Sequence, residues 1–315
     1  MENSSSNNDQ KQMEQAIVNR IAQEAIAEQR RARRWGIFFK FFFAAYLVAF
    51  LIIYLPTDLG GAKISGGKHT ALVDIEGIIS TDAMANADHI VSGLRAAFED
   101  SSTAGIILRI NSPGGSPVQA AYINDEIRRL KGLYPDIPLY AVISDICASG
   151  GYYIAAAADE IYANESSIVG SIGVVMSGFG FVEAMKKVGI ERRLLHAGES
   201  KGFLDPFSPL KEEDLEHIDT LLTDVHEQFI SVVREGRGDR LSDDENLFTG
   251  LIWTGKQSLE LGLIDGIGSA GYVARELVGE EDIVDYTRRD TFLDTFAKQI
   301  GTAVAEILEK RLQLQ

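Results

Sequence analysis

The sequence predicts an α/β fold with a mainly parallel sheet flanked by helices, preceded by one N-terminal transmembrane helix. Short apolar runs alternate with helical patterns from about residue 70 onward, which is typical of successive βαβ units. Ahead of them, residues 35–55 are almost wholly apolar. At about 1.5 Å per residue this segment spans roughly 31 Å as a helix, which is enough to cross the hydrocarbon core of a bilayer.

The apolar segment also has the flanking residues of a membrane anchor. Trp35 and Tyr54 lie near its two ends, where aromatic rings favour the membrane interface, and Lys40 is close enough to one end for its amine to reach the headgroups. A buried core helix is an alternative, but core helices rarely run this long without a polar face. A cleaved signal peptide is the nearer alternative, although its charged leader and its apolar run would be unusually long.

Charge predicts the orientation of the anchor. Four arginines precede it: Arg30, Arg31, Arg33 and Arg34. Residues 1–40 carry seven Lys/Arg against five Asp/Glu, whereas the rest of the chain carries 23 against 41. Because positively charged flanks stay in the cytoplasm, we expect the N-terminus inside and residues 56–315 outside. Such an acidic exterior argues against a nucleic-acid partner, whose phosphates need Lys and Arg.

These observations divide the chain into five parts. We expect a cytoplasmic tail over residues 1–34, the transmembrane anchor over 35–55, a linker over 56–69, one folded domain over 70–288 and an amphipathic C-terminal helix over 289–315. Apolar residues recur at helical spacing in the last part, so that helix either packs on the domain or contacts another chain.

Strand patterns and helix patterns follow one another within the folded domain. The expected strands are residues 71–79, 105–110, 139–146, 160–163, 171–176 and 191–195. The expected helices are residues 88–99, residues 117–130, a helix that begins near Ser149, and residues 211–234. Helices between short apolar strands supply the crossovers that parallel neighbours require.

Cysteine and histidine give no sign of a metal or cofactor. The one cysteine, Cys147, excludes an intramolecular disulfide and a cysteine-based metal site. The five histidines show no metal-ligand spacing: His69, His89, His196, His217 and His226. We therefore expect no bound metal ion and no cofactor.

Two segments follow predicted strands and precede predicted helices. Residues 112–116 read Ser-Pro-Gly-Gly-Ser, a turn whose backbone N–H groups can closely approach a ligand and stabilise an oxyanion. The alternative is an ordinary tight turn. Residues 147–153 read Cys-Ala-Ser-Gly-Gly-Tyr-Tyr and place Ser149 at a helix N-terminus, where negative charge is favoured. A serine at this place is also a common N-cap.

A third segment, residues 198–202, reads Gly-Glu-Ser-Lys-Gly and contains Lys201. A lysine between glycines is usually a solvated loop residue, and a catalytic role needs its amine desolvated beside a serine. Serine is a weak nucleophile that requires a base, and a Ser-Lys pair is an accepted alternative to Ser-His-Asp. Cys147 is an alternative nucleophile, but we expect it to point into the sheet.

Together the three segments resemble those of the signal peptide peptidase A family. Members of this family are membrane-bound serine proteases with a Ser-Lys dyad. The resemblance covers about residues 70–285, including Trp-Thr-Gly at 253–255 and Gly-Leu-Ile-Asp at 262–265. It implies a Clp protease/crotonase-like fold, with Ser149 as nucleophile and Lys201 as general base. One departure is Ser200, where many relatives carry an aromatic residue.

The resemblance also implies supporting residues and a biological setting. Gly114, with Gly115 nearby, and Gly150 would supply the oxyanion hole, and Ser171 would orient the lysine. Substrates would be remnant signal peptides, and the protein would form homo-oligomers. We expect it in the bacterial cytoplasmic membrane with its catalytic domain outside. The alternatives are a crotonase-like acyl-CoA enzyme, which leaves Lys201 without a role, and a non-catalytic membrane scaffold.

Overall fold

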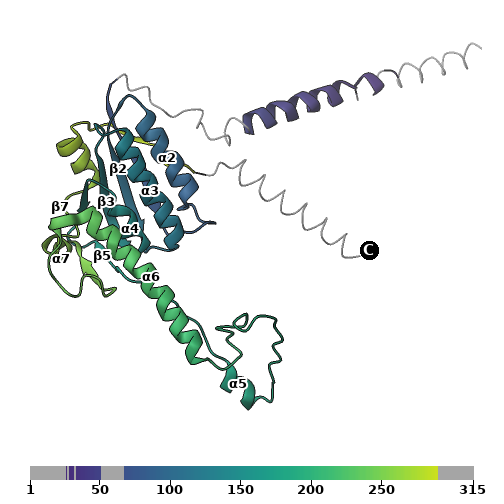
Figure 1. Ribbon diagram of the computed structural model, residues 1–315. Helices are drawn as coiled ribbons and strands as arrows, with labels where there is room; N and C mark the ends of the chain where they lie inside the picture. Colours follow the sequence, from purple (N-terminus) through teal and green to yellow (C-terminus); the bar gives the residue numbers. More distant parts are fainter. Residues whose placement is uncertain (1–25, 27, 32, 51–66, 290–315) are drawn as a thin grey trace, which may run out of the picture. The chain divides into compact units, whose positions relative to one another are not determined.

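The computed structural model of the chain describes residues 26, 28–31, 33–50 and 67–289 (Figure 1). Residues 62–290 form one unit, and the N-terminal helix belongs to a second. In that helix the side chains of Trp35, Phe41 and Phe43 are exposed. Among the described residues, no helix is long and apolar enough to cross a membrane. The expected anchor continues into residues 51–55, which lie outside the described residues, as do most of the expected tail, linker and C-terminal helix.

An eight-stranded sheet forms the centre of residues 62–290. Its main path runs β6-β5-β3-β2-β1-β8, and β4 and β7 continue from β3 on a second branch. Every strand pair is parallel except β5 with β6. The strands are β1 (His69–Glu76), β2 (Thr103–Ser112), β3 (Leu139–Ala148), β4 (Glu160–Ala163), β5 (Ile168–Gly170), β6 (Ile252–Thr254), β7 (Gly266–Ile267) and β8 (Ile283–Asp285). The mainly parallel α/β sheet is therefore confirmed.

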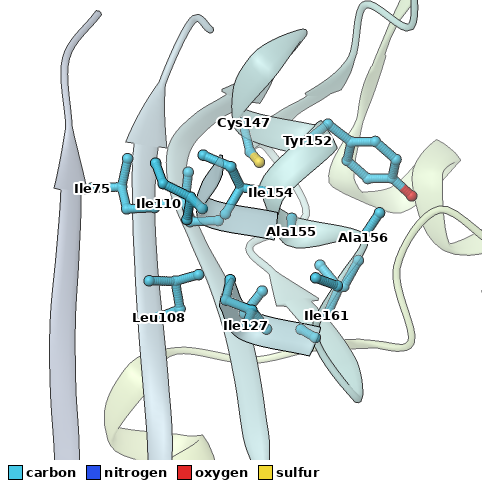
Figure 2. Close-up of a cluster of buried hydrophobic side chains, with 14 of the residues drawn as sticks. Ile75, Leu108, Ile110, Ile127, Cys147, Tyr152, Ile154, Ala155, Ala156 and Ile161 are labelled. Atoms are coloured by element: carbon cyan, nitrogen blue, oxygen red, sulfur yellow. The ribbon is translucent and has the colours of Figure 1, made fainter. Parts of the chain in front are cut away.

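Successive side chains of a strand point to opposite faces of the sheet, so apolar strands make both faces apolar. Helical elements cover both of these faces. Ile106, Leu108 and Ile110 of β2 pack in the core beneath helices α2 (Ala87–Glu99), α3 (Pro117–Leu133) and α4 (Gly150–Ala155). Ile107 faces the opposite way, into a smaller cluster with the π-helix η2 (Val273–Val278). Figure 2 shows the larger cluster, in which α4 lies against β2 and β3.

The local sequence accounts for where helices α2 and α3 begin. The side chain of Asn86 accepts a hydrogen bond from the His89 N–H at the start of α2, and Ser116 caps α3, whose first residue is proline. The remaining helical elements are α5 (Val182–Lys187), α6 (Glu212–Arg237), η1 (Gly238–Arg240), α7 (Gly255–Glu260) and α8 (Ala270–Tyr272).

Helix α6 contacts the sheet domain from its midpoint to its C-terminal end. Arg237 is buried there and donates two hydrogen bonds to Asp265, at 2.6 and 2.9 Å. Burial alone would raise the pKa of the Asp265 carboxyl, but the hydrogen bonds and charge of Arg237 hold it below its ordinary value. The buried residues of α6 are Phe229, Val233 and Arg237, and none lies in its first half.

Residues 174–210, which we call the arm, extend from the N-terminal end of α6. Figure 1 shows α5 and the arm's loops at the end of α6 that lies away from the sheet. No residue of the arm is buried, and Val175, Phe179 and Leu195 are more than four-fifths exposed. The strands expected at 171–176 and 191–195 are wrong, since neither segment forms a strand that pairs with any other described residues. Ile172 in the first segment is buried, but Val175, Met176 and Leu195 are not covered by the described part of this chain.

Candidate active site

Ser149 occupies a strained turn between β3 and α4. Its backbone has φ 51° and ψ −121°, a conformation that side-chain-bearing residues rarely adopt. The Ser149 N–H donates to Gly170 O at 2.9 Å, and the Ser149 carbonyl accepts from the Tyr153 N–H at 3.0 Å. The hydroxyl makes no capping hydrogen bond to α4, so the N-cap interpretation is not supported. Such strain costs about 1–3 kcal/mol and is concentrated at functional sites.

The glycine turn at 112–116 lies directly against Ser149. Gly114 has φ 101°, and a Cβ atom there would lie 2.7 Å from Ser149 Cβ and 2.8 Å from Ala148 O. A Cβ on Gly115 would lie 2.1 Å from Ile79 O. The turn is held by Ile79, whose N–H donates to Gly114 O and whose carbonyl accepts from the Ser116 N–H. Only glycine therefore allows this close approach of backbone to the serine.

The two glycines of this turn differ in what their N–H groups contact. The Gly114 N–H donates to Ser112 Oγ at 3.1 Å, and that hydroxyl donates to Gly77 O at 2.6 Å. Among the described residues, the Gly115 N–H has no hydrogen-bond acceptor, and it lies near Gly150. Gly115 and Gly150 both line the same cavity as Ser149. The geometry therefore favours Gly115 over Gly114 as the donor that accompanies Gly150.

Strand register brings Ser171 beside Ser149. Ala148 at the end of β3 is paired with Gly170 at the end of β5, so the next residue of each strand lies at the same edge of the sheet. Ser171 has φ 53°, and its N–H donates to Leu251 O at 2.7 Å. Two serines with unusual backbone conformations are thus adjacent at one carboxyl edge, where sites of parallel sheets commonly form.

The cavity at this edge has a volume of about 970 Å³. Its walls come from the glycine turn, α3, α4, residues 171–175, the middle of α6 and residues 249–250. Apolar side chains make up much of the lining: Val118, Tyr122, Val174, Val175, Val225 and Phe229. Among the described residues that line the cavity, Asp125 carries the one carboxylate and His226 the one imidazole. A cavity of this composition fits an apolar side chain of a peptide.

Lys201 does not line this cavity. It lies in the arm, exposed, with its backbone N–H donating to Gly198 O at 3.1 Å. Helix α6 starts at Glu212 and reaches the cavity at His226, which is roughly 21 Å farther along its axis. His196 is also on the arm, where its Nδ1 contacts Gly198 O at 2.9 Å. A single chain in this structure therefore does not join Lys201 to Ser149.

Cys147 is fully buried in the core beneath α4 (Figure 2). Burial raises the pKa of its thiol far above the ordinary value, which disfavours the reactive thiolate. It does not line the cavity. The structure thus favours Ser149 over Cys147 as nucleophile.

The comparisons with known proteins agree with this geometry. The sequence pattern of Peptidase family S49 matches residues 133–283. A protein of Synechocystis sp. whose name assigns it as a protease is 33% identical over 207 residues, which cover 66% of this chain and 72% of that protein. The chain belongs to peptidase family S49. Membership of this family supports the assignment of the chain as a serine protease.

Other relatives are longer than the part they share with this chain. The chloroplastic serine protease SPPA of Arabidopsis thaliana is 30% identical over 73% of this chain and 35% of its own length. A Brucella abortus protein named Na(+)/H(+) antiporter NhaA is 43% identical over 71% of this chain and 29% of its own length. The chain thus spans about a third of the length of these two relatives.

Sequence patterns did not indicate every lining residue of this S49 site. His226 and Phe229 lie on α6, and Thr249 and Gly250 follow later in the chain. The i, i+4 spacing of Val225, Phe229 and Val233 does indicate an apolar stripe on this helix. The stripe does not indicate which sheet edge the helix meets. Within the described residues, no group of three or more His, Cys, Asp or Glu side chains could hold a metal ion.

Gly114→Ala should slow peptide hydrolysis by about 100-fold or more, because the added methyl group would push Ser149 away from the oxyanion donors. The kcat of the purified variant measures this effect, with circular dichroism as the check on folding. Gly132→Ala in α3 is the matched control, since a Cβ there meets no atom within 4 Å. A Gly114→Ala protein that never folds would show that the glycine is structural.

Proposed function

We propose that this chain is a membrane-anchored serine endopeptidase with a Ser-Lys dyad, in which Ser149 attacks the peptide carbonyl and Lys201 accepts its proton. The observation that carries the proposal is the strained Ser149 at a cavity wall, beside the N–H groups of Gly115 and Gly150. These donors and the N-terminus of α4 can stabilise the oxyanion that forms. Gly114 contributes by lacking a side chain.

The position of Lys201 leads us to place the active site between two copies of the chain. The arm carries exposed apolar residues that the described part of its own chain leaves uncovered. It also carries five Lys/Arg against four Asp/Glu, whereas the chain beyond residue 40 is strongly acidic. In a homo-oligomer the arm of one copy would bury these residues on its neighbour and bring Lys201 to that neighbour's Ser149. Burial there would desolvate the lysine amine, as a general base requires, and Ser171 would orient it.

The substrates we propose are peptides with apolar segments, in particular remnant signal peptides after their release from preproteins. The apolar lining of the cavity supports this substrate class. Exposed aromatic residues along the N-terminal helix support an anchor in the bacterial cytoplasmic membrane, with the catalytic domain outside. The partners are then the bilayer, the peptide and further copies of this chain, without nucleic acid or cofactor.

Mixing two inactive variants tests the shared site. Ser149→Ala and Lys201→Ala chains, co-expressed in equal amounts and purified in detergent, should recover roughly a quarter of wild-type activity. Half of the nucleophiles and half of the lysines are intact in a random mixture. If the homo-oligomer is a closed ring, each site takes its serine from one copy and its lysine from the next, so about a quarter of the sites hold both groups. Hydrolysis of a fluorogenic apolar peptide measures the recovery. Mixtures as inactive as their components would contradict a site that is shared between copies.

A further inference from the structure

His226 lies at the midpoint of α6 and contacts the turn next to the nucleophile. Its Nε2 atom is 3.2 Å from Ile172 O, and the imidazole lines the same cavity as Ser149 and Ser171. A carbonyl oxygen can only accept a hydrogen bond, so the ring nitrogen in this contact is the donor. The contact joins residues 54 positions apart in the sequence.

The turn that His226 contacts is bonded to Ser149 on its other side. Gly170 O accepts the hydrogen bond of the Ser149 N–H, and Ile172 is fully buried two residues later. Between them, Ser171 has a positive φ and is tied to Leu251 through its N–H. A residue in such a conformation keeps it only when the surrounding contacts fix it.

We propose that His226 is a positioning residue, whose Nε2–H fixes the Ile172 carbonyl and thereby the turn that holds Ser149 in its strained conformation. This deepens the proposed function, because it rests on Ser149 as the nucleophile. It also gives α6 a second role. The helix that extends to the arm at its N-terminal end touches the nucleophile's turn at its midpoint, so one rigid element links the two halves of the site.

Substitutions separate this role from proton transfer by the imidazole. The amide nitrogen of glutamine reaches about as far as Nε2 of histidine and can donate the same hydrogen bond, whereas the shorter asparagine cannot reach, and alanine has no donor. A glutamine amide cannot accept a proton at neutral pH. His226→Gln should therefore still hold the turn in place, while His226→Asn and His226→Ala should not. Glu227→Gln is the control, because Glu227 is the next residue of α6 and is exposed outside the cavity.

The first measurement is hydrogen exchange of full-length protein in detergent, followed by mass spectrometry of peptides that cover residues 168–175. We expect faster exchange in this segment for the Ala and Asn variants, and wild-type exchange for His226→Gln and Glu227→Gln. The second measurement is peptide hydrolysis. The Ala and Asn variants should lower kcat by about 10- to 100-fold, since small misplacements of reacting groups have effects of this size, with KM within about twofold of wild type.

Two results would overturn the proposal. If His226→Ala and His226→Asn exchange like wild type, the contact does not hold the turn. If His226→Gln is as slow as His226→Ala, the imidazole does something that a donor alone cannot do. Should His226→Ala fail to fold, the Gln and Asn variants still make the comparison. A wild-type protein without hydrolytic activity would contradict the proposed function, whereas the exchange data would still decide whether His226 fixes the turn.

Discussion

Ser149→Ala is expected to abolish peptide hydrolysis, with a fall in kcat on the order of 10⁴-fold or more. In the proposed mechanism this hydroxyl forms the acyl-enzyme, and the oxyanion donors alone would give little turnover without it. The variant should fold and assemble normally, because the Ser149 hydroxyl makes no hydrogen bond to cap α4. Steady-state hydrolysis of a fluorogenic peptide, with size-exclusion chromatography of the same sample, measures both properties.

Ser149→Gly tests whether the backbone at this position is strained. Glycine adopts positive φ without strain, so this inactive variant should be more stable than Ser149→Ala by about 1 kcal/mol. Urea unfolding of the two variants gives that difference. The nucleophile assignment is wrong if Ser149→Ala retains substantial activity and Cys147→Ala loses it.

Lys201→Ala and Lys201→Arg are expected to be equally inactive, again with losses on the order of 10⁴-fold. A guanidinium keeps its proton at any working pH, so arginine can supply charge and bulk but cannot serve as a base. Lys187→Ala is the matched control, since Lys187 is an exposed lysine on the same arm. Comparison of kcat for the three variants at one protein concentration measures the effect.

An active arginine variant would mean that Lys201 contributes charge or packing. The base would then have to be another group, and His196 on the same arm would be the first to replace. A fall in assembly together with activity, seen as a shift to monomers on size exclusion, would show that the lysine acts on the interface between copies.

The mainly parallel sheet and most element boundaries follow from local patterns. The expected strand at 160–163 and helix at 117–130 agree with β4 and α3 to within a few residues, because apolar periodicity and the Ser116-Pro117 start are local signals. The arm is different. Residues 191–195 carry a strand pattern, yet within residues 67–289 no partner strand pairs with them. Local patterns report that a segment is apolar, but they do not report what buries it.

In the candidate site too, some residues could be predicted from local patterns and others could not. Ser149, Gly150 and Ser171 follow strand ends, and parallel pairing alone brings such residues to one edge of the sheet. Lys201 reaches no such edge in a single chain, so its role could be inferred only from a family resemblance. His226 lies in a helix far along the chain, and nothing in its local sequence indicates that it meets residue 172. Contacts of this kind depend on how the long α6 docks.

The most direct test of the central claim is the site of covalent labelling by a fluorophosphonate. This reagent forms a stable bond with an activated serine hydroxyl and leaves unactivated hydroxyls unmodified. Full-length protein in detergent is treated with the reagent, and the modified peptide is identified by mass spectrometry. The account predicts one adduct, on Ser149, which disappears in Ser149→Ala and is greatly slowed in Lys201→Ala. An adduct elsewhere, or no adduct on an assembled and folded protein, would contradict the account, and the second result would favour a non-catalytic scaffold.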